Sequence, residues 1–287
     1  MALPDGRHIM ATGIRDLFVW EIDSRECVYH GTIDAICRDG FASFSLVHDA
    51  LRFATADGTT EFALWDLGTF EKQRVFSGHT EEVRGFVFLG DDHGISVSHM
   101  SLRRWDLGTG ECLREAAAWP AWCVTAISTP TGRIAVGTTR GVQVIDPESL
   151  QSVLDIQLAF GILGRDPDPD TYKPWCSIST LTWIEEGTHL VCGGSDGLIR
   201  QIDANTGDVM QVWRACQEVE SLALLPGGDV FVASCSDGSV KFWRISSEQH
   251  LKVVELNDSV PGVCVTSEGR VFAACKDGLV YEIEAPP

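Results

Sequence analysis

A short strand ending that recurs along the whole chain limits what this sequence can fold into. Each copy is a run of β-forming residues that closes on a tryptophan or an isoleucine, usually followed by an acidic residue. The closing residues are Trp20, Trp65, Trp105, Ile145, Ile202, Trp243 and Ile283. Four of the six intervals between them are 40 or 41 residues long. Such a period is typical of repeated supersecondary units that bury their apolar faces only against their neighbours.

The residues within one period predict four short antiparallel strands. A tight turn precedes the closing strand, as at Asp196-Gly197 and Asp237-Gly238, and glycine accepts the positive φ that such hairpins need. An apolar strand lies upstream, and a glycine-rich turn after the closing residue leads into an outer strand. Four-stranded sheets of this length are the blades of β-propellers.

These residues resemble a known family. Gly78-His79 before a strand, followed by Trp105-Asp106, is similar to the Gly-His to Trp-Asp repeat of WD-repeat β-propellers. The resemblance covers all 287 residues and implies a single all-β domain, residues 1–287, built as a seven-bladed propeller of four-stranded antiparallel blades. It also implies a buried network of His, Ser or Thr, a turn Asp and Trp. His99-Met100 stands where the Asp belongs, so we expect this network to be incomplete.

The two chain ends predict an incomplete seam blade. Residues 1–6 align with residues 223–228, so the chain begins at the tail of an innermost strand, and residues 280–284 form a third strand without a fourth. The resemblance implies that N-terminal residues usually supply the closing strand. We therefore expect that a longer natural protein has lost that strand here, or alternatively that a partner donates it. Either way the edge at Tyr281 is open to strand addition.

Charge points to the kind of partner. The chain carries 41 acidic and 22 basic residues, for a net charge of −19. This charge repels nucleic acid and anionic membranes and favours a basic protein or peptide. The alternative is that acidic turns only keep the protein soluble.

The cysteines and the absence of long apolar runs predict a location. No apolar stretch reaches 18 residues, which predicts no membrane span, and residues 1–6 do not read as a leader. The ten cysteines contain no CxxC pair, and several, such as Cys192 and Cys235, fall in predicted strands. We expect them to be buried and reduced, which predicts a cytoplasmic protein, with a nuclear one not excluded.

Enzyme motifs are weak throughout. Residues 193–197 match the G-x-S-x-G nucleophile elbow, but a strand rather than a helix follows them. A pattern of quinone-binding propellers occurs once, at residues 203–207 with Trp213, whereas such enzymes repeat it in most blades. No histidine pair has metal-ligand spacing. We therefore predict no enzyme activity, no catalytic residue, no metal and no cofactor.

Two unusual connections between repeats are the predicted partner-binding sites. One carries two tryptophans, and the other is an inserted loop at residues 157–176, the source of a 57-residue interval. Long loops on rigid scaffolds often bind partners, and Trp and Tyr are enriched at binding hot spots. The alternative is that the insert covers a blade edge. The predicted partner-binding residues are Trp119, Trp122, Tyr172, Trp175 and Glu82. Trp20, Trp65, Trp105 and Trp243 are instead expected in the core.

The function predicted from these features is a non-catalytic scaffold that binds a partner protein or peptide on a propeller face. The alternative is the substrate receptor of a ubiquitin ligase or a subunit of another multiprotein complex. The resemblance implies that such a receptor has an arginine soon after the Trp-Asp pair. Leu67-Gly68 and Leu107-Gly108 stand at those positions.

Overall fold

The computed structural model describes most of the 287 residues. The described residues are 1–3, 5–12, 16–32, 43–46, 52–56, 59–90, 92–117, 127–128, 132–158, 176–184 and 187–286. Their regular structure is β, and they include no α-helix. None of these residues therefore belongs to a helix long and apolar enough to cross a membrane.

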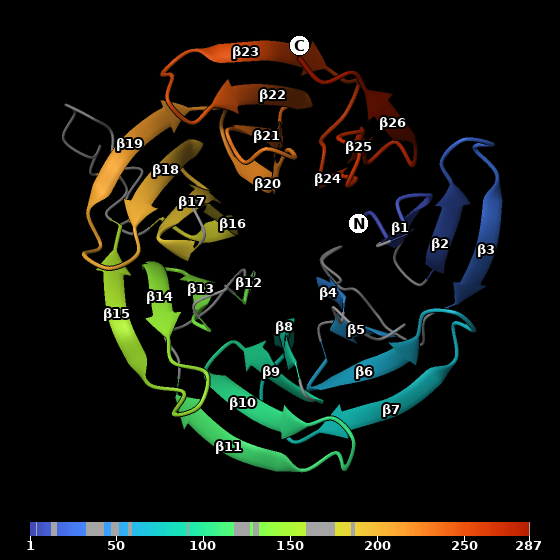
Figure 1. Ribbon diagram of the computed structural model, residues 1–287, viewed down its shortest axis with the longest axis vertical. Helices are drawn as coiled ribbons and strands as arrows, with labels where there is room; N and C mark the ends of the chain where they lie inside the picture. The colour runs from blue at the N-terminus through green and yellow to red at the C-terminus, as the bar shows by residue number, and fades with distance from the viewer. Residues whose placement is uncertain are drawn as a thin grey trace, which may run out of the picture. The chain divides into compact units, whose positions relative to one another are not determined.

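The strands form seven antiparallel sheets of three or four strands, each built from consecutive segments of the chain (Figure 1). Five sheets have four strands, and the first and last have three. This is the sheet composition of a seven-bladed β-propeller with an incomplete blade at the seam, which confirms the predicted fold class. Residue contacts divide the chain into two compact units, residues 1–33 with 179–287 and residues 34–178. The single domain of residues 1–287 stays a prediction.

The first unit contains the sheets from both ends of the chain. Its first sheet is β1 (His8–Thr12), β2 (Asp16–Glu21) and β3 (Cys27–Thr32). The next is β16 (Ile178–Ile184), β17 (His189–Gly194), β18 (Leu198–Asp203) and β19 (Val209–Arg214). It is followed by β20 (Val219–Leu224), β21 (Val230–Cys235), β22 (Ser239–Arg244) and β23 (His250–Glu255). The last sheet is β24 (Gly262–Val265), β25 (Val271–Ala274) and β26 (Val280–Ile283).

The second unit contains three four-stranded sheets. The first is β4 (Ser43–Leu46), β5 (Arg52–Ala56), β6 (Glu61–Asp66) and β7 (Lys72–Ser77). The second is β8 (Val83–Gly90), β9 (His93–Ser98), β10 (Ser101–Asp106) and β11 (Cys112–Ala117). The third is β12 (Ile127–Ser128), β13 (Ile134–Thr138), β14 (Gly141–Ile145) and β15 (Ser152–Gln157).

The recurring closing residues all occupy the same structural position. Each lies at or next to the end of the penultimate or last strand of its sheet, in β2, β6, β10, β14, β18, β22 and β26. Six of them are buried. Trp20 is the exception, since it is only half-buried. The prediction that Trp20 is a core residue was therefore wrong.

Apolar side chains pack between successive sheets within each unit. In the second unit the Phe62 and Phe76 rings stack with centroids 4.4 Å apart, and both meet the Trp105 indole edge-on at 5.6 Å. Phe62 and Phe76 belong to one sheet and Trp105 to the next. The closing tryptophan of one sheet thus packs against the outer strands of the sheet before it.

The buried polar network of the second unit is complete without the turn aspartate. The Trp105 Nε1 donates to the Ser96 hydroxyl at 2.7 Å, and the His79 Nε2 lies 2.6 Å from the same oxygen. The other ring nitrogen of His79 lies 3.0 Å from the hydroxyl of Ser101. The turn aspartate is absent from the network, as expected from His99-Met100, and the hydroxyl of Ser101 at the start of β10 contacts the second ring nitrogen instead. Burial, aided by the positive charge of Arg103, lowers the pKa of His79 to about 4.

One expectation about the cysteines is also corrected. Cys216 and Cys235 form a disulfide that ties the segment after β19 to the end of β21, so Cys235 is not a reduced thiol. Cys192, Cys264 and Cys275 are free, as expected. Full burial raises the pKa of the Cys192 thiol to about 12, so this residue acts as a small apolar side chain.

Candidate functional site at the edge of strand β26

Among the described strands, β26 has a neighbour on one side only. It pairs with β25, and no other described strand lies along its opposite edge. The Cys275 N–H donates to the Leu279 carbonyl at 3.0 Å, which fixes the phase of the hydrogen-bond ladder. Because an antiparallel ladder alternates, the backbone groups of Val280 and Glu282 point away from β25. This edge therefore offers donors and acceptors to an added strand.

The other sheets show what covers the equivalent edge when a further strand is present. Five apolar residues at the position of Val280 are each at most 1% exposed, namely Phe62, Leu102, Val142, Ile199 and Val240. Val280 itself is only half-buried. The residue before it differs even more, since Leu279 is 57% exposed and its equivalent Leu198 is 7% exposed. The last sheet therefore leaves exposed an apolar strip that is buried in the complete sheets.

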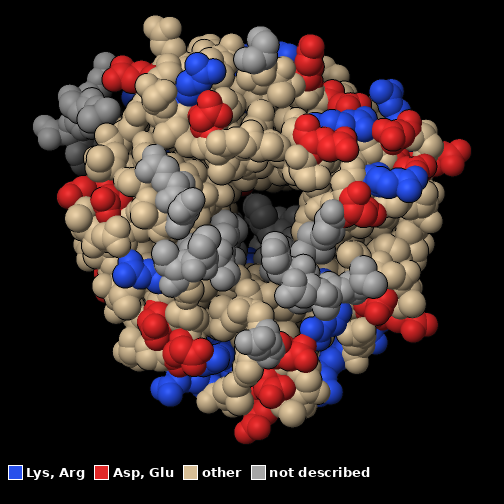
Figure 2. Space-filling model, viewed as in Figure 1, with Lys and Arg blue, Asp and Glu red and all other residues tan. Residues whose placement is uncertain are grey.

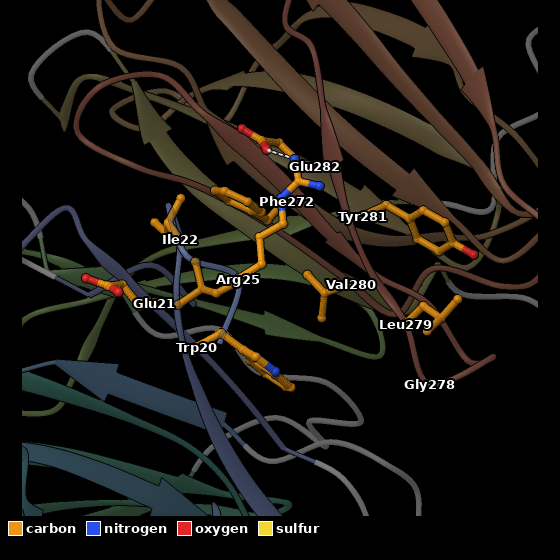
Figure 3. Close-up of a pocket in the computed structure, with 11 residues that line it drawn as sticks. Trp20, Glu21, Ile22, Arg25, Phe272, Gly278, Leu279, Val280, Tyr281 and Glu282 are labelled. Atoms are coloured by element: carbon orange, nitrogen blue, oxygen red, sulfur yellow. Dashed lines mark ion pairs between the residues drawn. The ribbon is translucent and has the colours of Figure 1, made fainter. Parts of the chain in front are cut away.

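A cavity of about 440 Å³ lies beside this strip, between the last and first sheets of the first unit (Figure 3). We call it the edge pocket, lined by Ile9, Trp20, Glu21, Ile22, Arg25, Phe272 and Gly278 to Glu282. Figure 3 shows the Val280 side chain directed toward the Trp20 indole and Tyr281 directed to the other side. Its apolar wall comes from Ile9, Trp20, Ile22, Phe272 and Val280, which belong to one hydrophobic cluster.

Charged residues mark one end of the edge pocket. The Arg25 guanidinium lies 3.6 Å from the Glu282 carboxylate (Figure 3). Glu282 also accepts a hydrogen bond from Arg270 at 2.8 Å, and Arg270 donates to Asp23 at 2.7 Å. The hydrogen bonds to these two carboxylates raise the pKa of Arg270, and Glu282 makes the larger contribution. The turn after β2 is thereby tied to the last sheet by alternating charges, and the acidic residues that line the pocket are Glu21 and Glu282.

The remaining features of the edge follow the same strand. The Tyr281 hydroxyl donates to Asp277 at 2.7 Å, which lowers the pKa of that carboxyl and raises the pKa of the phenol. A second cavity of about 420 Å³ continues beyond Glu282, lined among others by Arg25, Ile283 and Glu284. The two cavities share Arg25 and Glu282, so the hollow follows β26 along its length.

Comparisons with known proteins agree with this geometry. A family model described as WD domain, G-beta repeat, matches residues 207–244, which run from the turn before β19 to the end of β22. WD repeat-containing protein 18 of Mus musculus is 22% identical in an alignment of 307 positions, which covers 92% of this chain. These matches support a WD-repeat family for the chain. Members of this family are generally non-catalytic scaffolds.

Further relatives of this WD-repeat chain have different names. Nuclear distribution protein PAC1 of Arthroderma otae is 22% identical over 80% of the chain, and the serine-threonine kinase receptor-associated protein of Gallus gallus is 20% identical over 75%. The chain spans 64% of the length of the mouse protein, 54% of the fungal one and 62% of the chicken one. At this identity the relatives support a WD-repeat scaffold and do not specify a partner.

The predicted partner-binding residues of this WD-repeat chain are largely outside the described part. Trp119, Trp122, Tyr172 and Trp175 lie there, as does most of the insert at residues 157–176, so these sites stay predictions. Glu82 is described, and its carboxylate, 39% exposed, pairs with Arg84 two residues along the chain. The edge pocket was missed, although the predicted open strand at Tyr281 was the signal for its location.

The serine motif and the cluster around Cys216 have structural explanations. Ser195 lies in the turn between β17 and β18, where Gly197 has a φ of 72°, so the motif is a strand hairpin rather than a nucleophile elbow. Asp196 beside it forms a buried ion pair with Arg200. Among the described residues, potential ligand atoms of Cys216, Cys235 and Asp237 lie within 4.8 Å of one another. The two sulfurs are joined in the disulfide, so they are not thiolate ligands.

Proposed function

We propose that this WD-repeat chain is a non-catalytic interaction scaffold that binds an extended segment of a partner protein along β26. The observation that carries the proposal is the open edge of β26 beside the edge pocket. Strand addition uses main-chain hydrogen bonds for affinity and side-chain pockets for specificity, and this edge offers both.

The charge of the chain favours a basic partner. The net charge is −19, and Figure 2 shows acidic side chains at many places on the viewed face, interspersed with basic ones. Glu21 and Glu282 bring the same sign to the edge pocket. Such a surface speeds the encounter with a basic segment, and the effect weakens as salt is added.

Hydrogen exchange tests where a partner segment binds. Peptides selected from a random library against the chain should slow exchange at the amides of Val280 and Glu282. Protection confined to residues 118–126 and 157–176 would contradict strand addition and favour the predicted site at Trp119 and Trp122. In that case the variants Trp119→Ala and Trp122→Ala, rather than changes at β26, would weaken binding.

A proline variant makes this test specific to the strand edge. Glu282→Pro removes an outward N–H and leaves the pairs of Tyr281 and Ile283 with β25 in place. We expect it to abolish peptide binding. Val253→Pro is the matched control, because Val253 lies on β23, the outer edge of the preceding sheet, and its N–H also points outward. Equal loss in both variants would show that the effect is not local to β26.

We also propose a cytoplasmic or nuclear location, from the cysteine pattern of the sequence. Fractionation of the native host, with detection of the chain in each compartment, tests this. The disulfide between Cys216 and Cys235 makes the test informative, since most structural disulfides occur in oxidising compartments.

A further inference from the structure

We infer that the edge pocket receives a bulky apolar side chain that follows a basic residue by two positions in the partner segment. This inference rests on the proposed strand addition along β26 and specifies the chemistry of the partner. Its source is the set of complete sheets in the same chain, in which a fourth strand occupies the equivalent edge.

The fourth strands of the five complete sheets share one pattern. Most of their side chains are exposed, while the residue paired with the second position of the third strand turns inward. These inward residues are Phe76, Ala116, Ile156, Trp213 and Val254. Three of them are at most 4% exposed and the other two are half-buried. A fourth strand therefore inserts one apolar side chain into the core. In the last sheet this side chain would face Val280, the equivalent of Val240 in the sheet before it.

Two of these inward residues show what surrounds such a side chain. Phe76 lies between Phe62 of its own sheet and Trp105 of the next one. Trp213 packs against Phe231, with ring centroids 5.0 Å apart, in a cluster that includes Ile199 and Trp243. Phe76 thus contacts the third strand of its own sheet and the closing tryptophan of the next, and Trp213 shares a cluster with the equivalent two residues.

The edge pocket has the same walls without the inward residue. Val280 takes the place of Phe62 or Ile199, and Trp20 takes the place of Trp105 or Trp243. Ile9 pairs with Trp20 as Phe231 pairs with Trp243. The cavity of about 440 Å³ therefore lies where the strand that pairs with β26 would place its apolar residue.

The basic residue follows from the pairing two positions away. The fourth-strand residue opposite the fourth position of the third strand is basic in three of the five complete sheets, as Arg74, Arg114 and Lys252. Arg74 donates to the Gly108 carbonyl at 2.9 Å, and Lys252 donates to the Glu284 carbonyl at 2.8 Å. Both therefore reach the turn that ends the third strand of the next sheet.

The last sheet has acidic groups where that basic residue would lie. The residue of its third strand that corresponds to Leu64, Arg104 and Phe242 is Glu282, and the next turn, after β2, contains Asp23. A basic side chain there would replace the contact of the highly exposed Arg25 with Glu282. The partner segment would pair antiparallel with β26. From its N-terminus to its C-terminus it therefore has a basic residue, then any residue, then Phe or Trp. The occupant is thus a basic and aromatic segment of another protein.

Peptides test the rule directly. The probe is a capped peptide with the residues of β7, Lys72–Ser77, which contain Arg, Val and Phe in the required order. Its affinity for the full chain is measured by calorimetry. Replacing its Phe with Ala should weaken binding at least tenfold, because the aromatic side chain then no longer fills the pocket. Replacing its Arg with Glu should weaken binding by about fivefold to tenfold, and more at low salt.

Methylation of single backbone nitrogens of the peptide tests its register against β26. In complete sheets the N–H of Leu158, Ala215 and Leu256 donates inward to the third strand, so the inward apolar residue two positions earlier does the same. N-methylation of the peptide Phe should therefore abolish binding. N-methylation of the preceding Val, whose N–H points to solvent, should change affinity by less than about twofold.

A protein variant fills the pocket from within. Val280→Trp places an indole in the edge pocket and should lower the affinity of the chain for the peptide by more than tenfold. Leu113→Trp, at an exposed position of β11, is the matched control and should have no effect. Circular dichroism of both variants confirms the fold. If Val280→Trp does not fold, Glu282→Lys with Glu71→Lys as control gives the same comparison through charge.

The possible results separate the two proposals. Binding that depends on the N–H of the peptide but not on its Phe and Arg overturns this inference and leaves strand addition in place. Binding that is indifferent to methylation, or no binding by any peptide while the chain self-associates through β26 in light scattering, overturns strand addition by a partner and this inference with it.

Discussion

Val240 and Val280 occupy the same position in neighbouring sheets, yet Val240 is fully buried and Val280 is only half-buried. The difference has one cause, since β23 covers Val240 and no described strand covers Val280. The pair offers a measure of what a fourth strand contributes.

The substitution Val240→Ala should therefore lower the stability of the fold more than Val280→Ala does. We expect a loss of about 2 to 3 kcal/mol in the free energy of unfolding at Val240 and about 1 kcal/mol at Val280. Chemical denaturation of both variants measures this. Addition of a bound peptide should raise the cost at Val280 toward that at Val240. Equal losses without peptide would show that Val280 is as well packed as its counterpart.

His79 should make the protein less stable as the pH falls. The pKa of His79 is about 4 in the folded chain, and its ordinary value, expected in the unfolded chain, is 6.5. As the pH falls, the unfolded chain therefore binds a proton before the folded chain does. Stability from this residue is complete above pH 6.5 and decreases between pH 6.5 and pH 4, by on the order of 3 kcal/mol. The measurement is denaturant unfolding across this range. The His79→Gln variant should lose most of this pH dependence, and an unchanged slope would contradict the assignment.

The buried pair of Asp196 and Arg200 should be costly to break from either side. Their side chains are 3% and 5% exposed, and a buried charge without its partner costs about 3 to 5 kcal/mol. We expect such losses for Asp196→Ala and for Arg200→Ala, and much smaller losses for the double variant Asp196→Leu with Arg200→Met. Arg7→Ala, at an exposed pair with Glu21, should change stability by less than about 1 kcal/mol.

The disulfide between Cys216 and Cys235 should stabilise the chain in a way that reductant removes. It closes a loop of 19 residues, for which chain entropy predicts about 3 kcal/mol. Thermal unfolding with and without reductant measures the effect, and Cys216→Ser should be less stable and insensitive to reductant. Cys27→Ser, at an exposed free thiol, is the control. A wild-type protein that unfolds at the same temperature in both conditions would contradict this prediction.

The repeated strand endings explain why the fold was predictable. A tryptophan or isoleucine that recurs mostly every 40 or 41 residues, as at Trp105 and Ile145, marks the same strand in successive sheets. The hairpin at Ser195 was likewise predictable, because the residues on both sides of it alternate as strands. Local patterns therefore determined the elements and their order.

The edge pocket was not predictable from local patterns. Ile9 and Trp20 lie near the start of the chain and Val280 near its end, so the sequence does not show that they line one cavity. The role of Ser101 depends on a hydroxyl reaching a ring 22 residues away, which no motif encodes. The bond between Cys216 and Cys235 joins the segment after β19 to the end of β21, in the next sheet, through residues without a recognisable spacing.

The partial exposure of Trp20 gives the molecule a built-in optical reporter. The other described tryptophans, Trp65, Trp105, Trp183, Trp213 and Trp243, are buried and emit from an apolar environment whether or not a partner is present. The indole of Trp20 meets water in the free chain and would meet an aromatic ring in the complex. The difference in emission between the wild-type chain and Trp20→Phe isolates this one fluorophore. Its shift to shorter wavelength would follow occupancy of the edge in real time, without a label on either molecule.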